Sequence, residues 1–114
     1  NAKVESSNTN HSNNKSFIAA TLTRCSSGSP KVSINNVDVD CTEAKLKPAL
    51  ISYFKSLNKN PYNSSVDSMR EGKGIPALGQ SYLDVTLKVY SLKTNVGDAD
   101  GNEYIKGPIS MTRE

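Results

Sequence analysis

The sequence predicts one α+β domain over residues 1–114, in which an N-terminal helix packs on a small antiparallel β-sheet. The length of 114 residues fits a single domain. Apolar residues at helical spacing lie in the first half of the chain, and period-two alternation lies in its last third. Helices and strands are therefore segregated along the chain, as they are in α+β folds. The predicted parts are residues 1–25, 31–79 and 81–112.

The composition indicates a small core under a large polar surface, because apolar residues make up only 35% of the chain and Trp is absent. The net charge of +3 comes from 14 basic and 11 acidic residues, which are mixed along the chain. There is no block of like charges of the kind that marks a nucleic-acid-binding tail. No run of roughly 18 apolar residues and no signal peptide is present, and we expect any targeting segment to lie upstream of Asn1.

The first helix is predicted from a stripe of residues at helical spacing, which ends before Gly28 and Pro30. The members of the stripe are Phe17, Ile18, Thr21, Leu22 and Cys25. Residues 1–14 are polar and leave two interpretations. They continue the helix backwards as a surface that neighbours cover in an assembly, or they form a frayed terminus.

Residues 31–40 predict a small hairpin, because apolar residues alternate on both sides of Asn35 and Asn36, and Asn tolerates the backbone of tight turns. The only two cysteines, Cys25 and Cys41, flank this hairpin, too far apart for a CxxC motif. A single histidine leaves a zinc site short of ligands. We predict a disulfide in preference to two free thiols, which implies an exported protein. Closing a loop of about 15 residues stabilises a fold by about 3 kcal/mol.

Residues 42–59 predict a second helix from apolar positions at helical spacing. Thr42 suits its N-cap. Pro48 leaves a second interpretation, in which the helix begins at Lys47 and the proline lies in its first turn. Residues 58–79 form a long irregular connection, and such loops in compact domains are usually functional or adapted to the surface.

Residues 81–92 predict one strand with period-two alternation. Its predicted solvent face comprises Tyr82, Asp84, Thr86, Lys88 and Tyr90. Residues 93–102 predict a turn, and residues 103–112 a last strand that Gly107 and Pro108 interrupt. Pro108 favours an edge position, because proline cannot donate to a neighbouring strand. The predicted core of the domain comprises Phe17, Ile18, Leu22, Leu50, Phe54, Leu83, Val85, Leu87 and Val89.

Three stretches of the sequence carry a resemblance to a known family. They are Ser16–Cys25, then Leu50–Phe54 followed by Lys59–Asn63, and then Leu78–Tyr82. In turn they resemble the end of the long helix, the second helix with its exit loop, and the entry to the strand hairpin of type IV pilins. The resemblance is to the branch with a disulfide just after the first helix. The diagnostic apolar helix of that family, with its processing Gly and nearby Glu, is not in this sequence.

The resemblance implies a structural subunit of a bacterial type IV pilus, a surface filament for adhesion, motility or DNA uptake. Residues 1–25 would be the end of the long helix, whose apolar half anchors the subunit in the inner membrane before assembly. The implied partners are other copies of the chain, related pilins and the pilus assembly machinery, with no small-molecule substrate. Many pilins close a C-terminal loop with their disulfide, which this sequence does not allow, so no receptor-binding loop is carried over. The alternatives are a pseudopilin of a type II secretion system and a free periplasmic or secreted binding module.

The sequence does not predict an enzyme. Its single histidine, His11, lies in the polar lead-in, and no GxSxG motif is present. The residues Gly72-Lys73-Gly74 lack the spacing and context of a phosphate-binding loop. We therefore expect neither a catalytic site nor an organic cofactor.

Two binding sites are considered. Asp98, Asp100 and Glu103 surround a glycine turn, and clustered oxygen ligands suit Ca²⁺. The resemblance supports this prediction, because some related secretion pseudopilins bind calcium in a late loop, whereas the alternative is a solvated hairpin turn. Outward-facing tyrosines would form a weak stacking platform for single-stranded DNA, whereas the alternative is half-buried strand residues. The tyrosines concerned are Tyr62, Tyr82 and Tyr90.

Overall fold

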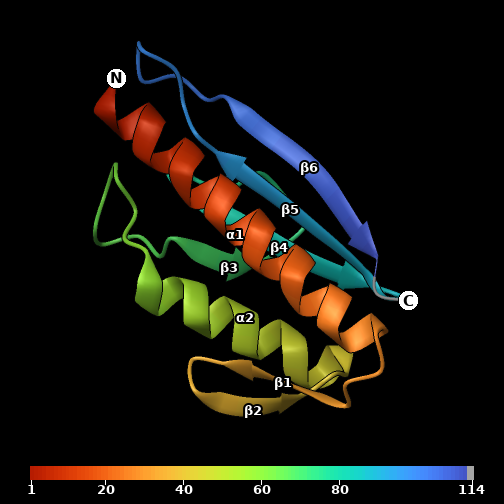
Figure 1. The fold of residues 1–114 in the computed structure, drawn as a ribbon. Coiled ribbons are helices and arrows are strands. Elements are labelled where there is room, and N and C mark those ends of the chain that lie inside the picture. The colour runs from red at the N-terminus through yellow and green to blue at the C-terminus, as the bar shows by residue number, and fades with distance from the viewer. Residues whose placement is uncertain (113–114) are drawn as a thin grey trace.

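The computed structural model describes residues 1–112, in which two helices and two sheets form an α+β domain, as predicted. The elements in chain order are α1 (Ala2–Ser26), β1 (Lys31–Ile34), β2 (Val37–Asp40), α2 (Glu43–Leu57), β3 (Met69–Glu71), β4 (Ser81–Thr86), β5 (Val89–Asn95) and β6 (Ile105–Thr112). Figure 1 shows α1 crossing the larger sheet, with the β1–β2 hairpin beyond α2.

The larger sheet has the strand order β3-β4-β5-β6. Its β4–β5 and β5–β6 pairs are antiparallel, of which only the second was predicted, and β3 is parallel to β4. The short strand β3 lies within residues 58–79, which the sequence predicted to be irregular throughout. The edge position of Pro108 is confirmed, since β6 lies at the end of the strand order. The predicted interruption at Gly107 and Pro108 is a register shift within a single strand, opposite the stretch between Leu92 and Thr94 of β5.

The prediction of one strand over residues 81–92 is wrong, because this segment is the β4–β5 hairpin. The chain reverses at Leu87 and Lys88, whose φ angles are 48° and 69°. A two-residue turn changes which residues of the second strand face the core. Leu87 is consequently 86% exposed, although it was predicted in the core, and Tyr90 is only 1% exposed, although it was predicted on the solvent face.

Helix α1 begins at Ala2, so the polar lead-in is helical rather than a frayed terminus. The Asn1 side chain caps it by accepting a hydrogen bond from the Lys3 N–H at 2.9 Å. Helix α2 begins at Glu43, with Thr42 at the N-cap position and Pro48 inside the helix. Because proline has no N–H, the carbonyl of Ala44 receives no hydrogen bond from Pro48. Ala44 is exposed, so its carbonyl is accessible to water, and Pro48 is tolerated near the start of the helix.

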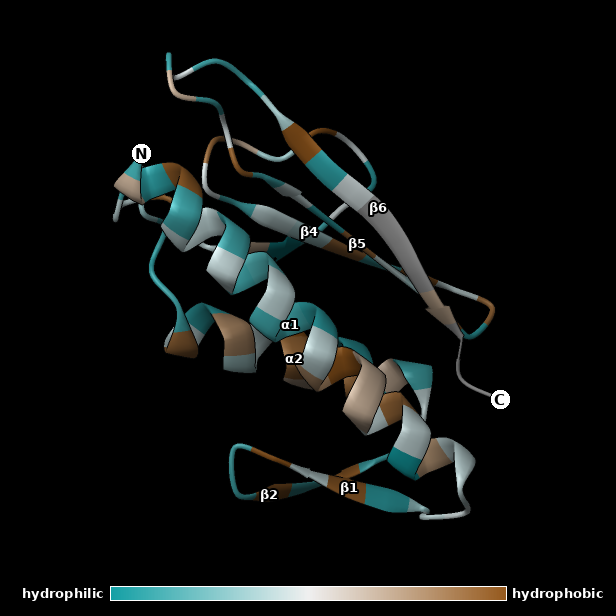
Figure 2. Cartoon of the chain, turned by 45° about the horizontal axis from the view of Figure 1, so that its top comes forward, coloured by the Kyte–Doolittle hydropathy of each residue, from teal (hydrophilic) through white to brown (hydrophobic). Residues whose placement is uncertain are grey.

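The apolar core lies where α2 and the C-terminal half of α1 pack on one face of the larger sheet. Figure 2 shows that apolar residues concentrate in α2 and the strands, whereas the N-terminal half of α1 is mainly polar. Phe17 is half-buried, with its ring 4.8 Å from that of Tyr53, and Val89 is also only half-buried. The predicted core residues that are buried are Ile18, Leu22, Leu50, Phe54, Leu83 and Val85.

Candidate functional site

The predicted disulfide is present between Cys25, in the last turn of α1, and Cys41, directly after β2. Their Cα atoms are 5.7 Å apart and both side chains are buried. The Cys41 N–H also donates to the Pro30 carbonyl at 3.0 Å, which closes the hairpin onto the loop after α1. The disulfide therefore attaches the β1–β2 hairpin to the C-terminal end of the long helix.

The face of α1 that packs on the sheet changes from polar to apolar along the helix. Its buried residues recur every three or four positions, first Ser7, His11 and Asn14, and then Ile18, Thr21, Leu22 and Cys25. The sequence predicted only the apolar half of this face, because a stripe of Ser, His and Asn gives no hydrophobic periodicity. The polar half could have been found from its spacing, because its residues continue the three- and four-residue intervals of the apolar half.

His11 is held in this polar half by a chain of hydrogen bonds from α1 into the sheet. His11 Nδ1 lies 2.8 Å from Thr94 Oγ1, which lies 2.6 Å from Ser81 Oγ. Burial and, to a smaller extent, the nearby cations of Lys106 and Lys15 lower the pKa of His11 to about 4. The imidazole is therefore neutral at pH 7. An imidazole beside two hydroxyls is the chemistry of a nucleophilic site, but all three side chains are buried in the domain, out of reach of a substrate.

Two of the stretches that carry the pilin resemblance pack against each other. Asn60 Nδ2 donates to the Leu78 carbonyl at 2.8 Å, and Asn60 Oδ1 accepts from the backbone N–H of Tyr62 at 2.8 Å. Gly79 has a φ of 78°, and a Cβ at this position would collide with Asn60 Oδ1. The exit from α2 and the entry to β4 therefore form one structural unit.

The predicted calcium ligands lie in the loop between β5 and β6. Asp98 Oδ1 accepts hydrogen bonds from the N–H groups of Asp100 and Asn102, both at 2.9 Å, which is the chemistry of an ordinary Asx turn. Within residues 1–112, no group of three His, Cys, Asp or Glu side chains gathers in a way that would hold a metal ion. Calcium binding by this loop stays a prediction.

Next to this loop, at the N-terminal end of α1, lies a surface groove of about 550 Å³ that we call the end groove. It is lined by Val4, Asn8, Val96, Gly97, Asp98, Tyr104, Ile105, Lys106 and Gly107. Tyr104 is 61% exposed, and Lys106 Nζ donates to Asn8 Oδ1 at 2.9 Å. The groove was not predicted from the sequence, because its apolar residues come from three separate segments and form no pattern.

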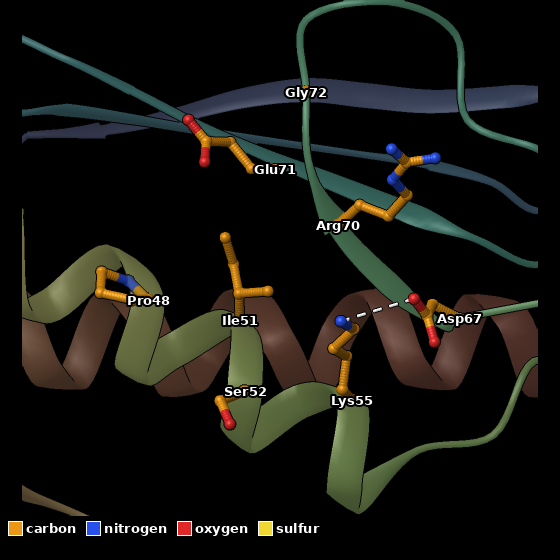
Figure 3. Close-up of a pocket in the computed structure, with 8 residues that line it drawn as sticks. All are labelled: Pro48, Ile51, Ser52, Lys55, Asp67, Arg70, Glu71 and Gly72. Atoms are coloured by element: carbon orange, nitrogen blue, oxygen red, sulfur yellow. Dashed lines mark ion pairs between the residues drawn. The ribbon is translucent and has the colours of Figure 1, made fainter.

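A second, larger groove of about 830 Å³ lies between α2 and β3 (Figure 3). An ion pair between Lys55 and Asp67, at 3.4 Å, crosses this groove. A second pair, between Lys47 and Glu71 at 2.8 Å, lies beside it. The hydrogen bond that Lys47 Nζ donates to the Glu71 carboxylate raises the pKa of Lys47. Exposed pairs of this kind contribute little to stability. The charges of the groove compensate each other, and its residues provide no nucleophile with a base.

The three tyrosines considered for DNA lie in separate places. Tyr90 is in the core, so its predicted outward position is wrong. Tyr82 is half-buried in β4, where its ring leaves no room for a Cβ at Gly72. Tyr62 donates a hydrogen bond to the Val96 carbonyl at 2.7 Å, and burial, with a contribution from Asp98, raises its pKa. The three rings do not form one continuous platform.

No protein-family model, no curated protein and no solved structure matches this chain. Within residues 1–112, neither helix is long and apolar enough to cross a membrane. The class that the structure defines is an α+β domain with a long N-terminal helix, two sheets and a disulfide.

Proposed function

We propose that this chain is the globular domain of a filament subunit of the type IV pilin kind. The observation that carries the proposal is the exposed face of α1. On the side away from its buried stripe, the helix presents mostly short side chains from its first turn to its last: Ala2, Ser6, Thr9, Asn13, Ser16, Ala20 and Thr23. The long charged side chains on this side are near its two ends, Glu5 beside Ala2 and Thr9, and Arg24 one turn after Ala20.

This face suits contact with another helix. The distance between packed helix axes depends on the side chains at the contact, and small side chains allow the closest approach. Helix α1 has 25 residues, or about 37 Å at 1.5 Å per residue, in a domain whose longest dimension is 46 Å. The face therefore runs along most of the domain, as required of a helix that lies between its own sheet and the helices of neighbouring subunits.

The disulfide and the surface composition also support a subunit that is exported and surface-exposed. A disulfide persists in oxidising compartments and stabilises domains that have small cores. The four-stranded sheet keeps both helices on one face, and on its other face Tyr82 and Lys93 contact the loop at Gly72 and Lys73 and remain partly exposed. That face would form the outer surface of the fibre.

The test uses the protein as its native cell makes it, because the proposal requires an apolar helix ahead of α1. Filaments sheared from the cells are identified by mass spectrometry and labelled with antibody to this domain in the electron microscope. We expect regular labelling along the fibre. Protein confined to the periplasm, with unlabelled filaments, would refute the proposal in favour of a pseudopilin or a free binding module.

A matched pair of variants tests the helix face itself. Ala20→Arg places a long charged side chain on the exposed face of α1, and Ser64→Arg places the same side chain on an exposed loop. We expect both variants to fold and only the first to lose filaments. Equal filament yield from the two variants would show that the α1 face is not an assembly surface.

A further inference from the structure

We propose that copies of this chain contact each other head to tail, with the Leu87–Lys88 turn of one copy seated in the end groove of the next. The inference rests on the proposed function, because it assigns one of the contacts between subunits. The contact uses only surfaces of this domain, so it is testable apart from the filament.

The turn carries an apolar side chain that neither the turn nor the core explains. Two-residue hairpin turns with positive φ favour Asn, Asp and Gly, and a bulky residue there is strained. Leu87 nevertheless has a φ of 48° and is 86% exposed. Strained positions concentrate at functional sites, and an exposed apolar side chain at the tip of a hairpin has the form of an interface anchor.

The end groove offers a complementary surface. Val4 and Ile105 line it as half-buried apolar side chains, and Tyr104 stands exposed at its side. The groove volume of about 550 Å³ is ample for one leucine side chain. Apolar anchors that enter a pocket contribute most of the binding free energy in protein interfaces.

The two surfaces lie at opposite ends of the domain. Strand β5 starts beside the turn at Val89 and reaches the loop of the end groove at Asn95, a distance of about 20 Å at 3.3 Å per residue. Figure 1 shows the β4–β5 turn near the C-terminal end of α1 and the β5–β6 loop near its N-terminal end. A head-to-tail contact between different surfaces produces an open filament unless the rotation between copies closes a ring, and surfaces at opposite ends of the domain favour the open form.

Charge complementarity identifies a second copy as the occupant. Lys88 follows the anchor residue at the tip of the turn, and the loop beside the end groove carries the exposed carboxylates of Asp100 and Glu103 together with Asp98. Lys106, in the groove lining, and Lys3 keep their positive charge, since Lys106 donates to the neutral amide of Asn8 and Lys3 Nζ lies 5.7 Å from the ring centre of Tyr62, so the complementarity of Lys88 is with the loop carboxylates and not with the groove as a whole. Opposite charges at an interface fix its orientation and exclude wrong partners.

Cysteine cross-linking of the purified chain at high concentration tests the contact. A chain with both Thr86→Cys, at the exposed position directly before the turn, and Tyr104→Cys keeps the Leu87 anchor and is treated with a short bismaleimide, which spares the native disulfide. We expect a ladder of multimers, because each copy has one head and one tail. The matched control replaces Val37, a residue of the other hairpin that is 60% exposed, so that Val37→Cys accompanies Tyr104→Cys. A ladder no stronger than that of the control, or a product that stops at dimers, would overturn the proposal.

Three further variants separate association from folding, with self-association measured by sedimentation. Leu87→Asn suits the turn better but removes the anchor, so we expect an unchanged or higher Tm and an association about ten- to hundredfold weaker. Lys88→Glu should also weaken association, and adding Glu103→Lys should restore it. Unchanged association in Leu87→Asn would contradict the proposal. If the antibody labels filaments of native cells but cross-linking gives no ladder, only the head-to-tail contact is wrong. If cross-linking gives a ladder but native filaments are not labelled, the proposed function is refuted.

Discussion

Acidification is predicted to destabilise this domain through one residue, His11. Its pKa is about 4 in the folded chain, because of burial and the nearby Lys106 and Lys15, against 6.5 for the unperturbed side chain. Between these two values the unfolded chain binds a proton that the folded chain does not bind. The free energy of unfolding therefore falls as the pH decreases from 6.5 toward 4, and this contribution is fully present above pH 6.5.

The size of this loss of stability follows from the number of pH units over which the folded and unfolded chains differ in protonation. Each pH unit in this interval is equivalent to about 1.36 kcal/mol, so lowering the pH from 7 to 5 removes about 2 kcal/mol. A domain of 114 residues has an unfolding entropy near 0.24 kcal/mol/K, which converts this loss to a decrease in Tm of about 8 °C. Thermal unfolding followed by circular dichroism at half-unit pH steps measures it.

The control for this prediction is His11→Asn. The asparagine amide replaces Nδ1 as the partner of Thr94 Oγ1 and does not titrate. Because the sequence has a single histidine, no other side chain has its ordinary pKa between 5 and 7. We expect the variant to keep a nearly constant Tm over this interval. Parallel pH curves for the two proteins would refute the assignment of the effect to His11.

Three other predictions concern stability. Reducing the disulfide between Cys25 and Cys41 should lower the free energy of unfolding by about 3 kcal/mol and the Tm by about 10 °C, and an unchanged calorimetric midpoint would show that the bond does not stabilise the fold. Gly79→Ala should cost clearly more stability in denaturant titration than Gly101→Ala, since both glycines have φ near 80° but only the first meets Asn60 Oδ1; equal losses would mean that the loop relaxes freely. Excess calcium should raise the Tm relative to excess chelator, because an ion bound by Asp98, Asp100 and Glu103 in the folded state alone stabilises that state; an unchanged Tm would show that Asp98 serves only the turn in which its Oδ1 accepts from Asp100 and Asn102.

Sequence patterns predicted the elements whose periodicity is apolar. Ile18 and Leu22 of α1, and Leu50 and Phe54 of α2, are buried at the helical spacing that identified them. The hairpin at Asn35 and Asn36 also has the positive φ angles that its turn residues favour. In these segments local preference and tertiary packing agree, so the sequence alone was sufficient.

The failures have a common physical cause, which is that tertiary structure overrides the local signal. Leu87 and Lys88 are not residue types that favour a tight turn. Leu87 and Val89 also continue the every-second-residue apolar pattern of β4, so the alternation appeared to run straight through the hairpin. Strand β3 has three residues and obtains its pairing from β4, so no local pattern identifies it. The end groove combines α1, β6 and the loop between β5 and β6, which only the folded chain brings together.

The two ends of α1 are held by different forces, and the difference bears on assembly. At the C-terminal end, apolar contacts and the disulfide fix the helix within the domain. At the N-terminal end, hydrogen bonds hold it, from His11 to Thr94 and from Lys106 to Asn8, and each contributes only about 1 kcal/mol net. The end groove lies between this part of the helix and β6, so a neighbouring copy seated there would contact both elements. Binding of one subunit to the next would therefore stabilise the weaker half of the fold, because a partner that binds only the folded state favours that state.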